Sequence, residues 1–337
     1  MKGKHHVRVS NGVLRYDFDI QRNITIIKGD SATGKTTLVE MIGEYYESGP
    51  ASGVELVCDK ECRTLAGRDW KMILPFVKDS IVFIDEDNEF LPTPEFAEAV
   101  RDSDNYYVIV TRESLPTLPY SVDEIYGIRT SGKYAGLNKT YQEFYHIYTE
   151  HRKGNTIRPD AVIVEDSNSG YEFFSNLSEG KGYNVVSAGG KSKIFDYIQT
   201  CDGKVVIVAD GAAFGAEMDR ITKAADQNED ITLFLPESFE WLILNAGIPT
   251  FDEVQMILDE PYQYIESSEY FSWERFFTHL LIEKSEDTFL KYSKRKLNPA
   301  YLKGSVLEKI LDSIKDIEAK TSKNQYKIKN LFVRGRL

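Results

Sequence analysis

Residues 29–37, GDSATGKTT, combine two glycines, a lysine and hydroxyl side chains in the spacing G-x-x-x-x-G-K-T. Glycines allow a loop to turn its backbone N–H groups inward around phosphate oxygens, and the N-terminus of a following helix adds partial positive charge. At this spacing Lys35 is expected to contact the β- and γ-phosphates of ATP or GTP, and Thr36 to supply a hydroxyl to Mg²⁺. A chance match in a turn is the alternative. The predicted nucleotide-binding residues are Gly29, Asp30, Ser31, Ala32, Thr33, Gly34, Lys35, Thr36 and Thr37.

A second group of candidate residues, Asp85 and Glu86, directly follows the apolar segment SIVFI. An Asp at the end of a buried strand can hold Mg²⁺ directly or through water, and a Glu after it can orient the attacking water. We therefore predict Asp85 as a metal ligand and Glu86 as a catalytic residue. Thr111 and Arg112 end another apolar segment, where a sensor of the γ-phosphate could lie. The alternative is that these strands simply end in polar residues.

Two carboxylates end apolar segments in the second half of the chain, Glu165 after AVIV and Asp210 after VVIVA. In an open parallel sheet the strand C-termini share one edge, where ligands bind. If these strands are neighbours, the carboxylates converge and suit a Mg²⁺ that keeps several waters. A generic α/β domain, whose strands end in acids because turns are polar, is the alternative.

The elements that must position these residues alternate between strands and helices. Asn11-Gly12 separates two alternating segments, which predicts a hairpin, and the helix after the glycine-rich loop is expected to start at Thr36. Strand–helix alternation predicts an α/β fold with a parallel sheet in each of two domains. We place the first domain at residues 1–147, a polar linker at 148–159, a second α/β domain at 160–248 and a helical C-terminal region with a basic tail at 249–337.

The composition narrows the class of protein. Of the 337 residues, 42% are hydrophobic, which is enough to form the cores of two domains. With this hydrophobic content and 28% charged residues, the composition is not that of a disordered chain. Three cysteines are an odd and sparse number, which favours reduced thiols in the cytosol. The first residues lack the apolar core of a signal peptide, and no apolar run is long enough to span a bilayer. We expect a cytoplasmic protein with no membrane partner.

The motifs of the first domain resemble those of P-loop ATPases of the ABC type, with a Walker A motif at residues 29–37 and a Walker B motif at 81–86. The resemblance covers roughly the first 140 residues and implies an ATPase with Mg²⁺ as cofactor. No sequence similar to the LSGGQ signature of that family lies between the two motifs. The resemblance therefore implies slow turnover, or a site that a second copy or a partner protein completes.

The second domain resembles Toprim domains, and the order of the two domains resembles the OLD (overcoming lysogenization defect) nucleases used in phage defence. In that resemblance Glu165 matches the Glu after the first strand, Asp210 matches the first Asp of a D-x-D motif, and Ala212 replaces the second Asp. Ser238 and Glu240 resemble an S-x-E element, which implies Glu240 as a further metal ligand. Glu217 or Asp219 could compensate for Ala212. The implied fold is a P-loop NTPase domain plus a Toprim-like α/β domain with a helical C-terminal extension.

Two basic segments stand out on a chain whose formal net charge is −12. One covers residues 291–303, and the other is the tail after Glu318, with Lys320, Lys323, Lys327, Lys329, Arg334 and Arg336 interleaved with Tyr326 and Phe332. Such segments could contact the phosphates of nucleic acid while their aromatic rings stack on bases. A solvated face, or a final strand at a sheet edge, is the alternative. The turn with Gly189, Gly190 and Lys191 could likewise touch a phosphate.

Three functions are compatible with the sequence. The first is an ATP-regulated, metal-dependent nuclease acting on nucleic acid, for which the expected catalytic residues are Glu86, Glu165 and Asp210. The second is an ATP-dependent sensor whose second domain is inactive and binds a partner or nucleic acid, as Ala212 suggests. The third is a P-loop NTPase whose second domain binds a small phosphorylated ligand.

Overall fold

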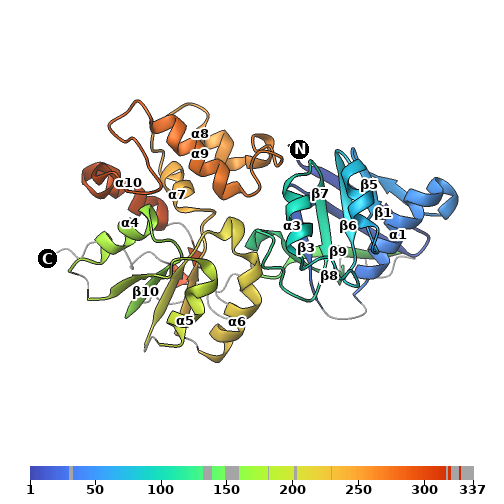
Figure 1. Cartoon of the computed structure of the whole chain (residues 1–337), viewed down its shortest axis with the longest axis horizontal. Helices are drawn as coiled ribbons and strands as arrows, with labels where there is room; N and C mark the ends of the chain where they lie inside the picture. Colours follow the sequence, from blue (N-terminus) through green and yellow to red (C-terminus); the bar gives the residue numbers. More distant parts are fainter. Residues whose placement is uncertain are drawn as a thin grey trace. The chain divides into compact units, whose positions relative to one another are not determined.

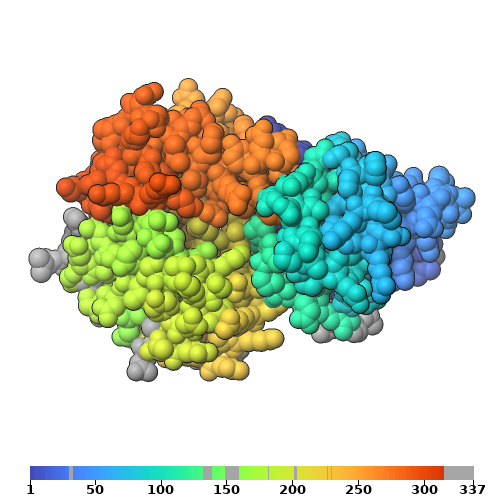
Figure 2. Space-filling view, in the orientation of Figure 1, coloured from blue at the N-terminus to red at the C-terminus, as the bar shows by residue number. Residues whose placement is uncertain are grey.

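The computed structural model describes residues 1–29, 33–131, 139–148, 159–180, 182–200, 203–228, 230–315, 318–319 and 326–327 (Figure 1, Figure 2). The chain divides into two compact α/β units. Unit 1 comprises Met1–Ile147 and Glu260–Phe271, and unit 2 comprises Tyr148–Asp259 and Ser272–Leu337.

The strands of unit 1 form one mixed sheet in the order β4-β1-β2-β9-β8-β3-β7-β6-β5. The predicted hairpin is confirmed, since β1 and β2 pair antiparallel with Ser10 opposite Arg15. In this order, the five consecutive strands from β8 to β5 run parallel to one another. The strand on the other side of β8, β9, runs antiparallel to β8 and parallel to β2. The strands are β1 (His5–Ser10), β2 (Leu14–Ile20), β3 (Ile24–Ile27), β4 (Glu55–Val57), β5 (Glu61–Thr64), β6 (Ser80–Ile84), β7 (Tyr106–Val110), β8 (Ile125–Thr130) and β9 (Thr140–His146).

Helices cover both faces of the parallel part of this sheet. Successive strand residues point to opposite faces, so Val108 joins the core beneath the first helix while Tyr107 faces the other way, with its ring 6.1 Å from that of Phe96 on α3. This two-sided burial explains why β6 and β7 are continuous apolar runs. The helical segments are α1 (Lys35–Ser48), η1 (Gly49–Ser52), α2 (Trp70–Ile73), η2 (Leu74–Phe76), α3 (Pro94–Arg101) and η3 (Val122–Glu124).

Residues 260–271, which include η8 (Pro261–Gln263), belong to unit 1 although they lie within the C-terminal part of the sequence. The Gly3 N–H donates to the Tyr262 carbonyl at 2.7 Å, and the Asn23 amide donates to the Phe271 carbonyl at 3.0 Å. The sequence analysis treated residues 249–337 as one region, because backbone contacts between distant segments leave no local pattern in the sequence.

Unit 2 contains the predicted parallel sheet, in the order β11-β10-β12-β13. Val164 lies opposite both Ser187 and Val208, and Val208 lies opposite Phe234, so the four strands end together at one edge. The strands are β10 (Ala161–Val164), β11 (Asn184–Ser187), β12 (Val205–Val208) and β13 (Ile231–Phe234); the connecting helical segments are α4 (Ser169–Ser178), η5 (Lys191–Lys193), α5 (Ile194–Ile198), η6 (Gly211–Ala213), η7 (Gly215–Glu217) and α6 (Met218–Gln227).

The chain after β13 is helical, as predicted. It forms α7 (Phe239–Asn245), α8 (Val254–Asp259), α9 (Trp273–Ser285), η9 (Pro299–Leu302) and α10 (Gly304–Lys315). The short strands β14 (Glu318–Ala319) and β15 (Tyr326–Lys327) pair antiparallel, and the remainder of the predicted basic tail lies outside the described residues. None of the helices in the described part of the chain has the length and apolar character needed to cross a bilayer.

Candidate functional sites

The glycine-rich loop of unit 1 connects β3 to α1, which begins at Lys35, one residue earlier than predicted. Gly29 and Gly34 adopt φ angles of 129° and 88°, which favour glycine. The buried Lys35 ammonium donates to the Gly29 carbonyl at 2.9 Å and to the Thr33 hydroxyl at 3.2 Å, so it lies between the two ends of the loop. Thr36 and Thr37 lie in the first turn of α1. The predicted nucleotide-binding residues 30–32 are outside the described part of the chain.

Tyr16 on β2 supports this loop, a role that the sequence analysis did not predict. Its hydroxyl donates to the Gly34 carbonyl at 2.8 Å, and a Cβ atom at Gly34 would lie 2.6 Å from that hydroxyl. Burial raises the pKa of Tyr16 to about 12, so the hydroxyl keeps its proton at neutral pH. Gly34 is therefore required both by its backbone conformation and by the close approach of Tyr16.

The carboxylates after β6 lie one strand away from the loop, because β7 separates β3 from β6 in the sheet. Arg112, which follows β7, pairs with Glu86 at 3.0 Å between Nη2 and Oε1. The other carboxylate oxygen of Glu86 is buried and has no hydrogen-bond partner within the described residues. Asp85 accepts a hydrogen bond from the Glu86 N–H at 2.8 Å. The Thr111 hydroxyl is engaged in its own turn, where it donates to the Glu113 carbonyl at 3.1 Å.

In unit 2, Glu165 and Asp210 follow the adjacent parallel strands β10 and β12, so the structure brings them to the same edge. The Glu165 carboxylate accepts a hydrogen bond from the Asp210 N–H at 3.0 Å. The Asp210 carboxylate accepts one from the Phe239 N–H at 3.2 Å, at the start of α7. Each side chain is thus held in place by the backbone of a neighbouring element.

The environment of this pair disfavours two negative charges. Burial raises the pKa of Glu165 to about 7, and repulsion from Glu274 on α9 adds to the effect. Burial also raises the pKa of Asp210 well above its usual value, as does repulsion from Glu274, Glu165 and Glu240. At neutral pH such a group of carboxylates either retains a proton or attracts a cation.

Ser238 and Glu240, which resemble an S-x-E element, make different kinds of contact in the structure. The Ser238 hydroxyl caps α7 by accepting a hydrogen bond from the Trp241 N–H at 3.1 Å, which gives it a structural role. Glu240 is 1% exposed, and its carboxylate accepts a hydrogen bond from the Tyr292 hydroxyl at 2.7 Å. Tyr292 also lies 2.6 Å from the Ser169 hydroxyl of α4, so Glu240 belongs to a buried polar network.

A lysine from the C-terminal region faces these acids. The Lys294 ammonium lies 2.6 Å from the Glu274 carboxylate and 4.0 Å from that of Glu240. Burial would lower the pKa of Lys294, but the charges of Glu240, Glu274 and Asp210 outweigh it and raise the pKa above its usual value. The sequence analysis did not single out Glu274, and it counted Lys294 only as part of a basic segment. Lys291, in the same segment, pairs with Glu286.

A small cavity of about 20 Å³ lies at this edge, with Glu165, Asp166 and Asp210 in its lining. That volume suits one water molecule or ion. Within the described ranges, no three or more His, Cys, Asp or Glu side chains are arranged to hold a metal ion. Ala212 is buried, and the Asp219 carboxylate accepts a hydrogen bond from the Tyr148 hydroxyl at 2.7 Å.

The glycine turn of unit 2 lies near the same edge. Gly189 and Gly190 have φ angles of 67° and 128°, and the Gly190 N–H donates to the Glu165 carbonyl at 2.8 Å. The Lys191 ammonium donates to the Ala213 carbonyl at 3.0 Å, and its charge lowers the pKa of Glu165 in opposition to burial. A second cation therefore acts on this acidic group.

No protein-family model matches the chain, and no curated protein matches it in sequence.

Proposed function

We propose that the chain is a P-loop NTPase that binds ATP or GTP with Mg²⁺ in unit 1, and that unit 2 is a Toprim-like, metal-dependent nuclease domain. The observation that supports the NTPase best is the arrangement of unit 1. A glycine-rich loop with a buried lysine precedes α1, and a carboxylate with an unpartnered buried oxygen follows β6. The resemblance to OLD nucleases adds a role in phage defence.

In this proposal each polar residue of unit 1 has a distinct task. The Lys35 ammonium exchanges its contacts with Gly29 and Thr33 for phosphate oxygens. Thr36 and Asp85 are the residues that would hold Mg²⁺, which supplies charge neutralisation for the phosphates. The free oxygen of Glu86 accepts a hydrogen bond from the attacking water, while Arg112 holds the other oxygen of that carboxylate in place.

In unit 2 the residues that would hold a divalent ion are Glu165 and Asp210, with Glu240 as the third ligand. Glu165 and Asp210 suit such an ion because both are buried at the same edge of the sheet and burial raises the pKa of each. Glu240 would have to give up its hydrogen bond with Tyr292 to join them, since no three such side chains of the described residues are arranged to hold a metal ion. A bound Mg²⁺ or Mn²⁺ would polarise a phosphodiester group. The exposed side chains of Arg295 and Lys296, in the basic segment next to Lys294, are available to contact a nucleic-acid backbone.

The nuclease assignment is tested by incubating plasmid DNA with the protein and Mg²⁺ or Mn²⁺, with and without ATP. We expect nicking that requires the metal and falls at least about tenfold in Asp210→Asn, the scale on which loss of one metal-supporting group acts. Asp196→Asn, at an exposed position on α5, is the matched control and should nick like the wild type. If the wild type and Asp210→Asn nick equally, the Toprim-like assignment is wrong.

A second candidate function is an ATP-dependent sensor whose Toprim-like domain is catalytically inactive. The observation that favours it is Lys294, whose ammonium pairs with Glu274 and lies 4.0 Å from Glu240, so that a positive charge is already present beside one of the proposed ligands. Ala212, in place of a possible third carboxylate, points the same way. This candidate predicts no nicking with any metal, together with intact nucleotide binding in unit 1 and binding of a partner or nucleic acid by unit 2.

A further inference from the structure

We propose that a second copy of this chain docks on one face of unit 1, formed by residues 70–78 and α3 and hereafter called the docking face. A groove of about 460 Å³ runs between these two segments, and its lining includes Trp70, Lys71, Leu74, Lys78, Glu95 and Glu98. The proposal rests on the shape, exposure and charge of this face and is independent of the ligand that unit 1 binds.

The segment that forms one side of the docking face exposes apolar side chains. Met72 and Phe76 lie in the same short segment, and their side chains are 65% and 86% exposed. Single exposed apolar residues are ordinary, but two large ones four positions apart in one short segment give that segment the exposed apolar surface that is common at interaction sites. Neither of them lines the groove, which the same segment borders with Trp70 and Leu74. An aromatic ring and a methionine side chain are also enriched in the buried centres of protein interfaces.

The charges on the docking face identify a second copy of the chain as its occupant. The wall formed by residues 70–78 carries Lys71 and Lys78. The wall formed by α3 and the residue after it carries Glu95, Glu98 and Asp102, and it remains acidic although Arg101 pairs with Glu98 and Asp102. In a dimer with two-fold symmetry, the same surface of each copy contacts that of the other, so the surface must be complementary to an identical copy of itself. A face with one basic and one acidic wall meets this condition, because the basic wall of each copy opposes the acidic wall of the other.

The docking face is held in place by the side chains beneath it. The Trp70 ring lies 5.2 Å from that of Phe90 and 5.6 Å from that of Phe96, which fixes the start of the segment against α3. Preorganisation of this kind lowers the entropy lost on association.

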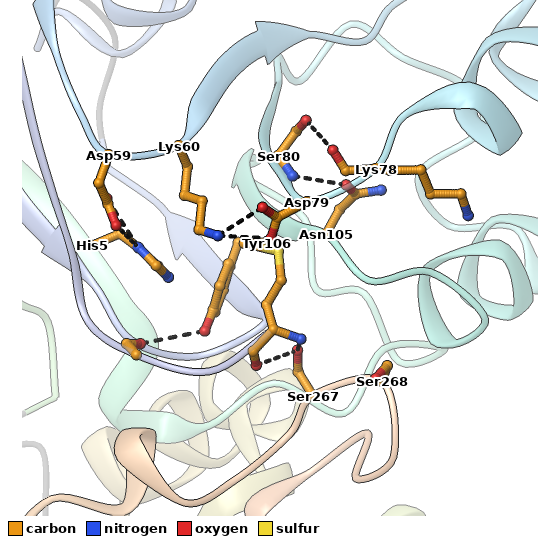
Figure 3. Close-up of polar contacts among 12 residues, drawn as sticks. His5, Asp59, Lys60, Lys78, Asp79, Ser80, Asn105, Tyr106, Ser267 and Ser268 are labelled. Carbon is orange, nitrogen blue, oxygen red and sulfur yellow. Dashed lines mark hydrogen bonds and ion pairs between the residues drawn. The ribbon is translucent and has the colours of Figure 1, made fainter.

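The end of the segment is fixed by hydrogen bonds. The Asn105 amide donates to the Val77 carbonyl at 2.9 Å and accepts a bond from the Ser80 N–H at 3.1 Å. Ser80 also donates to the Lys78 carbonyl at 2.7 Å, and Lys60 pairs with Asp79 at 2.8 Å. Figure 3 shows the contacts of Ser80 with Asn105 and Lys78 and that of Lys60 with Asp79, with the Lys78 side chain directed away from these polar groups. The Lys78 ammonium is thus available for a partner.

Sedimentation velocity of the full chain, from about 1 to about 100 µM, tests the proposal over the affinities typical of modest interfaces. We expect the wild type to shift from monomer to dimer, and Phe76→Asp to remain monomeric throughout. Phe289→Asp, which changes a Phe of unit 2 that is 77% exposed, is the matched control and should dimerise like the wild type. A wild type that stays monomeric, or a Phe76→Asp protein that still dimerises, would overturn the proposal.

Charge reversal tests the two-fold geometry directly. Lys71→Glu/Lys78→Glu makes both walls acidic, and Glu95→Lys/Glu98→Lys makes both basic, so each variant alone should be monomeric. An equimolar mixture should dimerise again, because each acidic wall then meets a basic one. Recovery in the mixture also shows that both variants fold. If the wild type dimerises but the mixture stays monomeric, the proposed opposition of the two walls is wrong.

Discussion

The stability of unit 2 should fall as the pH rises from about 5 to about 8 in the absence of metal, and Glu165 should be a main cause. Burial raises the pKa of this carboxyl from 4.5 to about 7. Between these values the folded state keeps the proton that the unfolded state loses, so the free energy of unfolding decreases as the pH increases. A shift of this size corresponds to roughly 3 kcal/mol at about 1.36 kcal/mol per pKa unit. Asp210, whose pKa is also raised, acts in the same direction.

Urea unfolding followed by tryptophan fluorescence measures this effect. In a Trp70→Phe background the remaining tryptophans, Trp241 and Trp273, both report on unit 2. Glu165→Gln cannot ionise, so relative to the parent it should gain roughly 3 kcal/mol of stability between pH 5 and pH 8. The difference between the two proteins reports the ionisation of Glu165 together with its effect on the pKa of the neighbouring Asp210, which the charge of Glu165 raises. If that difference is the same at both pH values, the side chain is not a buried acid with a raised pKa.

Divalent metal should reverse the trend, because its carboxylate ligands must be ionised to bind it. Mn²⁺ at about a hundred times its dissociation constant would stabilise the folded state by about 2.7 kcal/mol. We expect that stabilisation at pH 8, a much smaller one at pH 5, and none in Glu165→Gln. Equal stabilisation of the parent and Glu165→Gln at pH 8 would place the metal elsewhere.

Three further changes give direct tests. Glu86→Gln should lower the rate of ATP hydrolysis by at least about tenfold while nucleotide affinity stays within about twofold, since the carboxylate acts on water and not on the phosphates; a fast hydrolysis unaffected by this change would show that the catalytic group is another residue. Gly34→Ala should lower the free energy of unfolding of unit 1 by about 1 to 3 kcal/mol in thermal unfolding, because φ is 88° and the new Cβ would lie 2.6 Å from the Tyr16 hydroxyl. Adding Tyr16→Phe to the Gly34→Ala chain should recover part of that loss, and no recovery would argue against the contact. Ala212→Asp should strengthen Mn²⁺ binding in calorimetric titration, and an unchanged affinity would show that position 212 does not face the ion.

The sequence predicted those features that have a local signature. The Asn11-Gly12 turn between alternating segments identified the first hairpin, and the apolar runs before Glu165 and Asp210 identified two strands of a parallel sheet. The sequence left open whether these two strands are neighbours, which the structure shows them to be. Such runs are fully buried between helices, so their composition records their environment. α3 also has a local signature, since it starts with Pro94 after the capping residue Thr93.

Features that depend on distant parts of the chain left no such signature. The approach of Lys294 and Glu274 to Glu240 joins three separate helical or loop segments, and nothing in their local sequence distinguishes them from a solvated charged face. The support of Gly34 by Tyr16 likewise joins two elements whose separate patterns are ordinary. Ser238 is part of a short match to the S-x-E element, but its role as the N-cap of α7 is enough to explain why a serine lies there.

The central claim, that unit 1 binds a nucleoside triphosphate at the loop before α1, is tested most directly by isothermal titration of the protein with ATP and Mg²⁺. Lys35 is buried against this loop, and its replacement by Ala removes the ammonium that the proposal places on the β- and γ-phosphates. The account predicts saturable binding to the wild type, affinity weakened at least about tenfold in Lys35→Ala, or roughly 1.4 kcal/mol, and unchanged affinity in the surface control Lys4→Ala. Equal affinity of the wild type and Lys35→Ala, or no binding to the wild type, would contradict it.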